Sequence, residues 1–419
     1  MARTPAVPPA VAPTLPDRPG IDGLRALAVA AIVVADAGVG WLAGGLLGVE
    51  IFFVITAFLV TSLLVAEQHR TGRIDVLRFW GRRGRRMLPG LLTAIGGVSI
   101  LVLVTRPDEL YRLGPEVRAG LAGLTNWYLV WSSGPQPSTD PSMLHHLWPV
   151  AVGVQFLAWW PLACALLLPR IGRNRLRAVA WLLACASAVA MAVVALLADL
   201  PRALYGTDTR AAGLLVGAGL ALASRPGSWP ARATGARARR LRIVGLVVLA
   251  ALIALLAVVP PASDLALRGG VFLVAVLTAV TIVVVLRSPE FDRLLGAVPL
   301  RWVGLRSYGI YLWHWPVLIA LGGPSTVARP HMFVLYVALT AATADVSYRF
   351  VEMPLCRLRP VAGTGRVGRP NLAVRAMAMA CGAATVAALL TGQARPADAR
   401  SLAGPPGPTT SEAPDASGP

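Results

Sequence analysis

Long apolar runs recur along nearly the whole chain, and short polar stretches rich in arginine separate them. Most of these runs approach the length of about 20 residues that an α-helix needs to cross a bilayer. They predict an all-α fold, a polytopic transmembrane helical bundle with ten core spans plus an eleventh C-terminal span. A shorter run, 119–133, contains Asn126 and Ser132, and we expect it to be re-entrant or interfacial. The predicted spans centre on residues 24–44, 47–66, 87–105, 146–168, 178–198, 211–224, 243–259, 269–286, 308–323, 332–351 and 376–392.

Arginine is distributed unevenly between the loops of this predicted bundle. The chain has no lysine, so all 39 of its Lys and Arg residues are arginines. If 119–133 does not cross, the loops on one side hold 26 arginines and those on the other side hold 6. Cytoplasmic loops of membrane proteins carry the excess of positive charge. We therefore expect a multi-pass protein of the cell membrane with a cytoplasmic N-terminus and an extracytoplasmic C-terminus.

Composition supports the same class of protein. Apolar residues make up 56% of the chain and charged residues 14%, well below the roughly 25% charged residues of soluble domains. This composition argues against a cytosolic enzyme. The net charge of +19 follows from topology, so we expect membrane lipids, and not nucleic acid, as partners. The four cysteines show no CxxC and no zinc-ligand spacing, and we expect neither a disulfide framework nor a metal site.

Both ends of the chain differ from its apolar centre. Residues 1–19 are rich in Pro and Ala, and we predict a disordered cytoplasmic leader. Residues 20–360 form the predicted membrane domain, and a basic cytoplasmic loop, 361–375, and an extra transmembrane helix, 376–392, follow it. The tail 393–419 is rich in Pro, Ala, Gly and Ser. Because this composition cannot bury a core, we expect a disordered extracytoplasmic tail.

Polar side chains inside apolar spans are candidates for function, because a bilayer makes their burial costly. The first predicted span holds Arg25 and Asp36. Eleven residues make about three helical turns, so both lie on nearly one face, ~16 Å apart along the axis. We expect both side chains to lie along one internal cavity, with Arg25 near the cytoplasm and Asp36 deep inside the bundle. The alternative is that Asp36 only ends the helix before Gly38 and Gly40.

Histidines mark two further spans. His146 stands at the outer end of the span that also carries Trp148 and Gln155, and His314 lies between two tryptophans in a later span. An aromatic belt explains the tryptophans but not the imidazole between them. Charged residues near other span ends are interpreted as structural ion pairs or helix-end charges: Asp208 with Arg210, and Arg349 with Glu352.

A dense basic run precedes the third predicted span. Arg82, Arg83, Arg85 and Arg86 stand just before Pro89, at the expected cytoplasmic mouth of the bundle. The orientation of the spans in the membrane explains most arginine-rich loops, but this run holds more arginines than are needed to fix that orientation. Because a guanidinium binds phosphate in a bidentate manner, we expect the run to hold a phosphorylated donor.

Seven sequence blocks in order resemble those of the bacterial acyltransferase-3 membrane proteins. The blocks are RPGIDGLRALAVAAIVVADAG, GGLLGVEIFFVITAFLVTSLL, FWGRRGRRMLPGLL, HLWPVAVGVQFLAWWPL, TDTRAAGLLVGAGLAL, SYGIYLWHWPVL and SYRFVEMPL. Proteins of this family O-acylate surface polysaccharides, lipopolysaccharide and peptidoglycan, or decorate secreted glycans and lipids. The resemblance covers about residues 18–360 and implies ten core spans with both ends inside. Many relatives add an extracytoplasmic SGNH-type domain after an eleventh span, where we expect only the short tail.

The resemblance also implies a mechanism. Acyl-CoA would be the co-substrate, with no resident cofactor, and would bind from the cytoplasm at Arg25 and the arginines of residues 82–86. The acyl group would pass to a hydroxyl of an extracytoplasmic glycan, glycolipid or cell-wall acceptor. A base would take the hydroxyl proton. The candidates for the catalytic residues are Asp36, His146 and His314.

The match departs from the family pattern in its acid–base residues. Asp36 stands where the family has a proposed catalytic histidine, eleven positions after the basic residue that Arg25 matches. Gly153 and Val154 replace two adjacent acids, and Glu50 replaces an aspartate. The residues that we expect to support the site are Glu50, Trp148, Gln155, Asp208, Arg210, Arg349 and Glu352.

Two other classes of function stay open from the sequence alone. A catalytically weakened homologue that binds acyl chains or glycolipid, or acts as a partner subunit, would explain the loss of the histidine and the acids. A transporter or flippase is the second alternative, although the chain shows no inverted repeat and no paired broken helices. A membrane acyltransferase is the function we expect.

Overall fold

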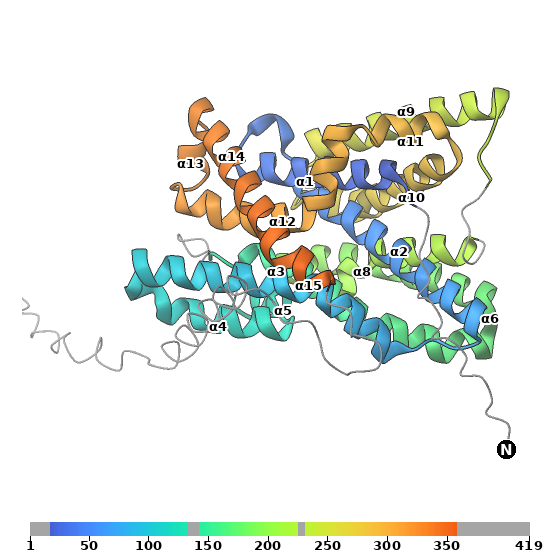
Figure 1. Cartoon of the computed structure of the whole chain (residues 1–419), viewed down its shortest axis with the longest axis horizontal. Helices are drawn as coiled ribbons and strands as arrows, with labels where there is room; N and C mark the ends of the chain where they lie inside the picture. The colour runs from blue at the N-terminus through green and yellow to red at the C-terminus, as the bar shows by residue number, and fades with distance from the viewer. Residues whose placement is uncertain (1–16, 133–141, 225–230, 358–419) are drawn as a thin grey trace, which may run out of the picture.

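The computed structural model describes residues 17–132, 142–224 and 231–357, and this part of the chain contains helices and no strand (Figure 1). The predicted all-α class is confirmed. Residues 1–16 of the predicted leader, the loop 361–375, the helix 376–392 and the tail 393–419 lie outside the described residues and stay predictions. The helices are α1 (Pro19–Asp36), α2 (Gly48–Thr71), α3 (Val76–Thr105), α4 (Leu110–Ala122), α5 (Thr125–Ser132), α6 (Trp148–Leu196), α7 (Leu200–Tyr205), α8 (Thr207–Ala223), α9 (Gly235–Val258), α10 (Val271–Arg287), α11 (Pro289–Leu295), α12 (Val298–Ala320), α13 (Pro324–Val327), α14 (Pro330–Ser347) and α15 (Met353–Arg357).

Six helical segments of the described chain are long and apolar enough to cross a membrane. This confirms a polytopic helical bundle, while the number of ten core spans stays a prediction. Helices α1, α8 and α12 correspond to three further predicted spans but are shorter or more polar. The six segments are Gly40–Thr71, Val76–Thr105, His145–Leu196, Gly235–Val258, Ala266–Arg287 and Pro330–Leu355.

Helix α1 ends earlier than the predicted span 24–44. Its last residue is Asp36, and Gly38 then adopts a left-handed conformation with φ of +76°, which glycine reaches without steric cost. Two short 3₁₀ turns, Gly40–Leu42 and Gly45–Leu47, lead from there into α2. Asp36 is therefore the last residue of α1, and the chain leaves the helix directly after it.

The long helix α6 is two antiparallel helices joined at a break. Gly172 has non-helical backbone angles (φ 75°, ψ 165°). Gln155, before the break, accepts a hydrogen bond from Thr207 at the start of α8. Ser187, after the break, donates a hydrogen bond to the backbone oxygen of Asp208, also at the start of α8. Between them Arg173 reaches Ser224 at the far end of α8. The chain therefore reverses at Gly172, in agreement with the two predicted spans 146–168 and 178–198.

The segment 119–133 does not form a helix of membrane-crossing length. It is divided between the end of α4 and α5, and Gly123 between them has φ of +67°. Helix α5 has eight residues, which extend only about 12 Å. The Asn126 side chain ties α5 to the α7–α8 junction by donating to Tyr205 O and Thr207 Oγ1.

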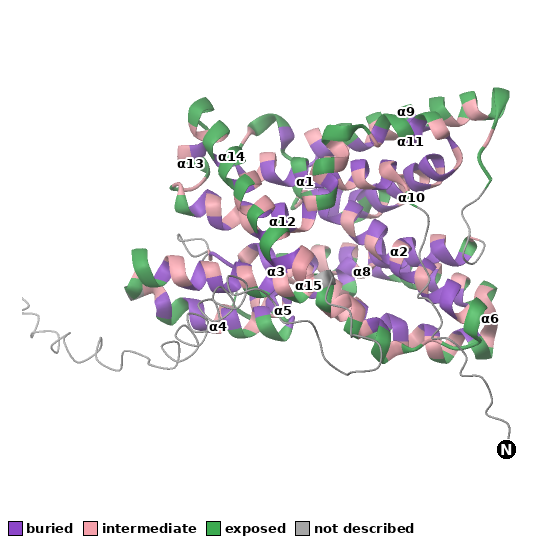
Figure 2. Ribbon diagram, in the orientation of Figure 1, coloured by how far each residue is buried: buried purple, intermediate pink, exposed green. Residues whose placement is uncertain are grey.

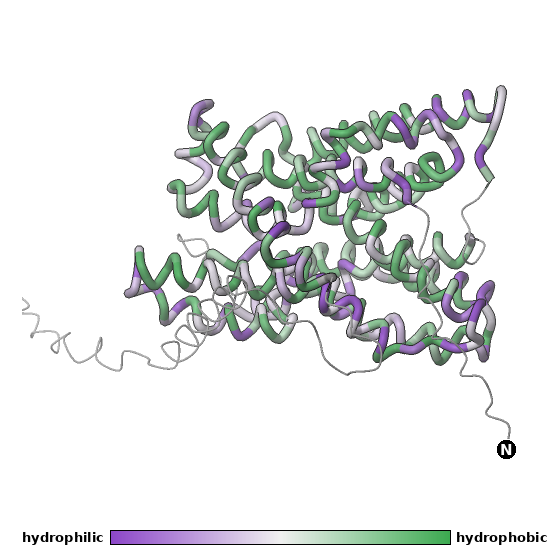
Figure 3. The backbone as a smooth tube through the Cα atoms, in the orientation of Figure 1, coloured by the Kyte–Doolittle hydropathy of each residue, from purple (hydrophilic) through white to green (hydrophobic). Residues whose placement is uncertain are grey.

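Helix α2 lies at the centre of the bundle, and α9 lies at its edge. Of the apolar part of α2 78% is buried, against 17% for α9, a contrast that is visible in Figure 2. Apolar side chains such as Val247, 64% exposed, cover the outer face of α9, and Figure 3 shows the helix as mainly hydrophobic. This surface suits lipid contact.

Glycines allow the central helices to approach closely. A Cβ atom on Gly217 of α8 would lie 2.2 Å from the backbone oxygen of Val54 in α2, and one on Gly23 of α1 would lie 1.8 Å from that of Leu295. Small residues at helix contacts are typical of membrane bundles. The first turn of α1 is also fixed by Asp292, whose Oδ1 accepts from Gly20 N at 2.9 Å. The contacts of Gly20 and Gly23 hold α1, which carries Arg25, against α11.

Candidate active site

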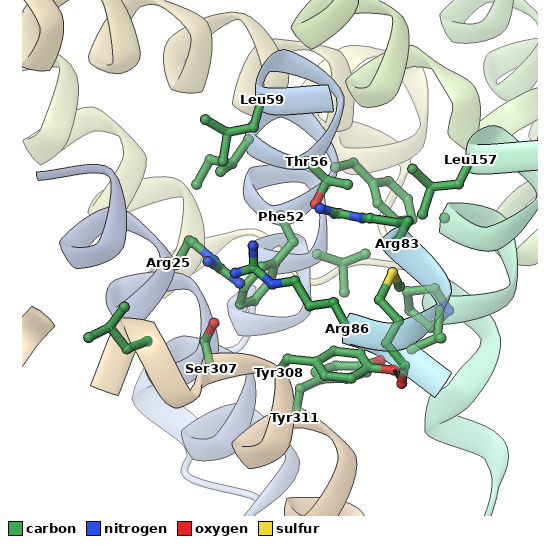
Figure 4. A pocket seen from close by; sticks show the side chains of 18 of the residues that line it. Arg25, Phe52, Thr56, Leu59, Arg83, Arg86, Leu157, Ser307, Tyr308 and Tyr311 are labelled. Carbon is green, nitrogen blue, oxygen red and sulfur yellow. Dashed lines mark hydrogen bonds between the residues drawn. The ribbon is translucent and has the colours of Figure 1, made fainter. Parts of the chain in front are cut away.

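A pocket of about 420 Å³ lies between α1, α2, α3, α6 and α12. Its walls are mainly apolar, and its polar groups include three arginines from two helices. Figure 4 shows the guanidinium groups of Arg25 and Arg86 side by side, with Arg83 near Thr56. The three like charges lie near enough to repel one another. A site that gathers positive charge in this way is suited to an anionic ligand.

The structure divides the basic run 82–86 between two faces of α3. Arg83 and Arg86 are three residues apart, so they share a helix face, and both line the pocket. Arg82 instead pairs with Glu67 at 3.3 Å, and Arg85 is not a lining residue. Within the described residues neither Arg83 nor Arg86 forms an ion pair. Two of the four predicted donor-binding arginines therefore face the pocket, together with Arg25.

Arg349 and Glu352, interpreted as a structural ion pair or as helix-end charges, do not pair with each other. Arg349 bonds Asp345 one turn earlier on α14, at 2.7 Å. Glu352 turns inward, lines the pocket and accepts a bond from the Ser347 hydroxyl at 3.5 Å. A π-helical turn at Tyr348–Glu352 extends α14 and changes the faces on which the two side chains lie. Glu352 thus adds one acid to the three arginines of the pocket.

A second polar region brings Asp36 and His314 together. His314 Nε2 lies 3.0 Å from Asp36 Oδ2, although 278 positions separate the two residues in sequence. The His314 side chain is fully buried, and that of Asp36 is 11% exposed. The end of α1 and the packing of α1 against α12 create this contact. Asp36 therefore does more than end a helix.

The hydrogen bonds of His314 fix the number of protons in this pair. Its Nδ1 lies 2.6 Å from the carbonyl oxygen of Tyr311, and because a carbonyl can only accept, Nδ1 must donate. The remaining contact joins Nε2 to a carboxyl oxygen of Asp36. A hydrogen bond there requires one proton, on either the ring or the carboxyl. The geometry therefore places one proton between His314 and Asp36.

His146 lies beside the pair. Its ring is in edge contact with that of His314 at 5.6 Å between centroids. Its Nε2–H donates to Leu312 O at 3.0 Å, which leaves Nδ1 as the nitrogen that carries a lone pair in the neutral ring. Nδ1 is buried and has no hydrogen-bond partner in the described chain. The three predicted catalytic residues, Asp36, His146 and His314, thus form one cluster.

Tyr311 separates this cluster from the arginine pocket. It lines the pocket, its hydroxyl donates to His146 O at 2.5 Å, and its carbonyl accepts from His314. Asp36 is not among the residues that line the pocket. Arg25 therefore lines this pocket and Asp36 does not, and the expectation that both lie along one internal cavity stays a prediction.

Asp208 and Arg210, interpreted in the same two ways, do not pair with each other either. Arg210 pairs with Glu50 of α2 at 3.1 Å, and both side chains are almost fully buried. Asp208 instead pairs with Arg202 of α7 at 2.8 Å in an exposed position. Arg210 also lies over the Trp148 ring, 5.0 Å from its centroid. The buried pair therefore joins α2, α6 and α8 next to the catalytic cluster.

Gln155 belongs to a satisfied network of side chains outside the pocket. Its amide donates to Gly123 O and Asn126 Oδ1, and its carbonyl accepts from Thr207 Oγ1. Every polar atom of this side chain is thus engaged with α5 or α8 or with the turn before α5. The predicted supporting role of Gln155 is structural in this geometry.

The two positions where the family pattern has acids lie in different surroundings. Gly153 lines the pocket, and a Cβ atom there would meet nothing within 4 Å. Val154 packs against Gly123 at the start of α5. The absence of a side chain at Gly153 therefore enlarges the pocket on the α6 side.

Three residues of this region are missing from the prediction. Tyr311 forms the wall of the pocket, and Tyr205 and Trp315 lie beside His145. For Tyr311 a signal was present, because it precedes His314 by three positions in SYGIYLWHW and so shares its helix face. Nothing in the sequence brings Tyr205 near Trp315, since 110 positions lie between them.

Comparison with known proteins identifies the family. A family model for an acyltransferase domain matches residues 18–349, and the chain therefore belongs to the acyltransferase-3 family. The O-acetyltransferase OatA of Staphylococcus aureus (strain NCTC 8325 / PS 47) is 32% identical over 344 residues, which cover 80% of this chain and 57% of that protein. No solved structure matches the chain.

Two further relatives have names that specify a substrate. The peptidoglycan O-acetyltransferase OatA of Listeria monocytogenes is 32% identical over 349 residues, and the putative peptidoglycan O-acetyltransferase YrhL of Bacillus subtilis is 33% identical over 350 residues. The alignments cover 80% of this chain and 55% and 54% of these relatives. The chain thus spans little more than half the length of the curated relatives that it matches.

Proposed function

We propose that this chain transfers an acyl group from a phosphorylated thioester donor, acyl-CoA, to a hydroxyl of a cell-wall glycan. The observation that carries the proposal is the contact of His314 with Asp36, which places an exchangeable proton behind the pocket wall formed by Tyr311. The names of the peptidoglycan O-acetyltransferases support the choice of acceptor. Arg25, Arg83 and Arg86 support the choice of an anionic donor.

The residues of the cluster would perform the proton transfers. When the pair lacks its shared proton, Asp36 and His314 take the proton of the acceptor hydroxyl as its oxygen attacks the thioester carbonyl carbon. The C–S bond then breaks, the thiolate leaves, and the proton returns from the pair to the sulfur. The products are an ester and a free thiol, and the pair returns to its initial state. Asp36 is the member through which the proton enters, because its side chain is partly exposed and His314 is buried.

The test is acyl transfer by the full chain in lipid vesicles, with radiolabelled acetyl-CoA as donor and a soluble peptidoglycan fragment as acceptor. We expect labelled glycan from the wild type and at least a 100-fold slower transfer by His314→Gln, since general acid–base catalysis contributes about 10²–10⁴-fold. The matched control is His331→Gln, which changes a histidine at the exposed start of α14 and should leave transfer unchanged. Saturable donor binding without labelled product in the wild type would instead support a catalytically weakened homologue.

A further inference from the structure

A chain of aromatic rings leads outward from the buried Glu50–Arg210 pair to the surface beside the catalytic cluster. Arg210 lies over Trp148, whose ring centroid is 5.5 Å from that of Tyr205. Tyr205 meets the His145 ring at 5.6 Å, and His145 meets Trp315 at 6.0 Å. We call Tyr205, His145 and Trp315 the ring cluster. Each of its members is half-buried.

The ring cluster lies directly against the catalytic residues. His145 precedes His146 in the chain, and Trp315 follows His314. His145 is also close enough to Asp36 for their charges to interact. Two members of the ring cluster are thus direct chain neighbours of His146 and His314, on the side of the bundle where the Asp36 side chain is partly exposed.

Hydrogen bonds hold the members of the ring cluster in place. The Tyr205 hydroxyl lies 3.3 Å from His145 Nε2, and its backbone oxygen accepts from Asn126. Trp315 Nε1 donates to Ser142 O at 2.8 Å. Rings that are fixed before binding lose little conformational entropy when a ligand arrives.

The ring cluster differs from an ordinary membrane-interface tryptophan. Trp41, which follows α1 at the same end of the bundle, is 70% exposed and belongs to none of these ring pairs. Belt residues of that kind lie at the headgroup level. The members of the ring cluster instead contact one another and are half-buried.

We infer that the ring cluster binds a pyranose ring of the acceptor glycan and presents one of its hydroxyls to Asp36 and His314. A pyranose has apolar C–H faces, which pack on aromatic rings, and a rim of hydroxyls, which bond polar atoms. Tyr205 and His145 offer both, a ring face and a hydrogen-bonding edge. The inference rests on the proposed function, because it names the acceptor side of the same reaction.

The test measures sugar binding without any donor. The full chain in lipid nanodiscs is titrated with tetra-N-acetylchitotetraose, and binding is followed by saturation-transfer difference NMR. We expect saturable binding to the wild type, with the sugar C–H protons receiving the strongest transfer. Trp315→Ala should weaken binding at least 10-fold. Trp315→Phe should weaken it less than 3-fold, because a ring remains although the bond to Ser142 is lost.

The matched control is Trp41→Ala, which removes an exposed tryptophan at the same end of the bundle and should change binding less than 2-fold. Donor binding by each variant verifies that it is folded. Absence of saturable binding to the wild type, or equal losses in Trp315→Ala and Trp41→Ala, would overturn the inference. Since no donor is present, loss of acyl transfer with intact sugar binding would refute the proposed function and leave this inference standing.

Discussion

The two polar regions on either side of Tyr311 are built in opposite ways. In the arginine pocket, Arg83 and Arg86 form no ion pair within the described residues, and their charges repel that of Arg25, whose Nη1 lies 3.9 Å from Asp22 Oδ1. In the catalytic cluster, both ring nitrogens of His314 are engaged, one by Tyr311 and one by Asp36. Unbalanced charge is suited to binding a ligand, whereas a closed set of hydrogen bonds is suited to holding and moving a proton. The contrast supports our proposal that the first region binds the donor and the second performs the proton transfer.

The sharpest test of this division is Asp36→Asn. The variant keeps the shape of the side chain but removes its capacity to take the acceptor proton, so we expect at least a 100-fold loss of the transfer rate. The dissociation constant of the donor should change less than 2-fold, because Asp36 does not line the pocket. Stopped-flow transfer assays and donor titration measure the two quantities separately.

The same position offers a gain of function. The variant Asp36→His should show the transfer activity that Asp36→Asn loses, since an imidazole exchanges protons near neutral pH. The matched control is Asp264→Asn, a highly exposed carboxylate, which should behave like the wild type. Transfer at the wild-type rate by Asp36→Asn would show that the cluster is not the chemical centre.

The second prediction concerns the arginine pocket. Arg83→Gln and Arg86→Gln should each weaken donor binding about 10- to 100-fold, because each removes a charged hydrogen bond worth about 1.5–3 kcal/mol, and the double variant should lose more. The matched double variant Arg82→Gln and Arg85→Gln removes the same charge from the other face of α3 and should weaken binding less than 3-fold. Titration with a non-hydrolysable acyl-CoA analogue measures both. Equal losses would mean that the run acts only through its total charge.

These two tests also separate what the sequence predicts from what it does not. The apolar runs predicted most of the helices, and the spacing of Arg25 and Asp36 placed both on one helix face. The density of the run 82–86 indicated a binding role, but helical periodicity allows either 83 with 86 or 82 with 85. The choice between them depends on which face of α3 meets α12 and α6, and that is a property of tertiary packing.

Ion-pair partners were the least predictable part of the site. Nearby opposite charges in sequence, such as Asp208 and Arg210, looked like pairs, but the residue that bonds Arg210 is 160 positions away in α2. Glu50 is buried there because Gly213 of α8 lets α2 approach closely. Contacts of this kind depend on how helices stack, so local spacing does not reveal them. The same reason hides the contact between Asp36 and His314.

The third prediction uses the open space at Gly153. Gly153→Leu should fill part of the pocket and weaken donor binding about 5-fold, while the protein gains thermal stability, because glycine destabilises a helix interior by roughly 0.5–1 kcal/mol. Gly81→Leu, on the exposed face of α3, is the matched control, since a Cβ there also meets nothing and the residue is not in the pocket. It should gain stability with unchanged donor affinity. Unchanged affinity in Gly153→Leu would show that the donor does not occupy this side of the pocket.

The smallest expected effect belongs to Tyr311→Phe, which tests the wall itself. The variant keeps the ring between the two regions and removes only the hydroxyl that donates to His146 O at 2.5 Å. We therefore expect the free energy of unfolding to fall by about 1 kcal/mol. The transfer rate should stay within 3-fold of the wild-type rate. Tyr311→Ala removes the ring that packs between the two regions, so water gains additional access to the thioester from the side of Asp36 and His314. Acceptor-independent hydrolysis of the donor should then rise in Tyr311→Ala and not in Tyr311→Phe. If hydrolysis rises equally in both variants, the hydroxyl and not the ring separates the two regions.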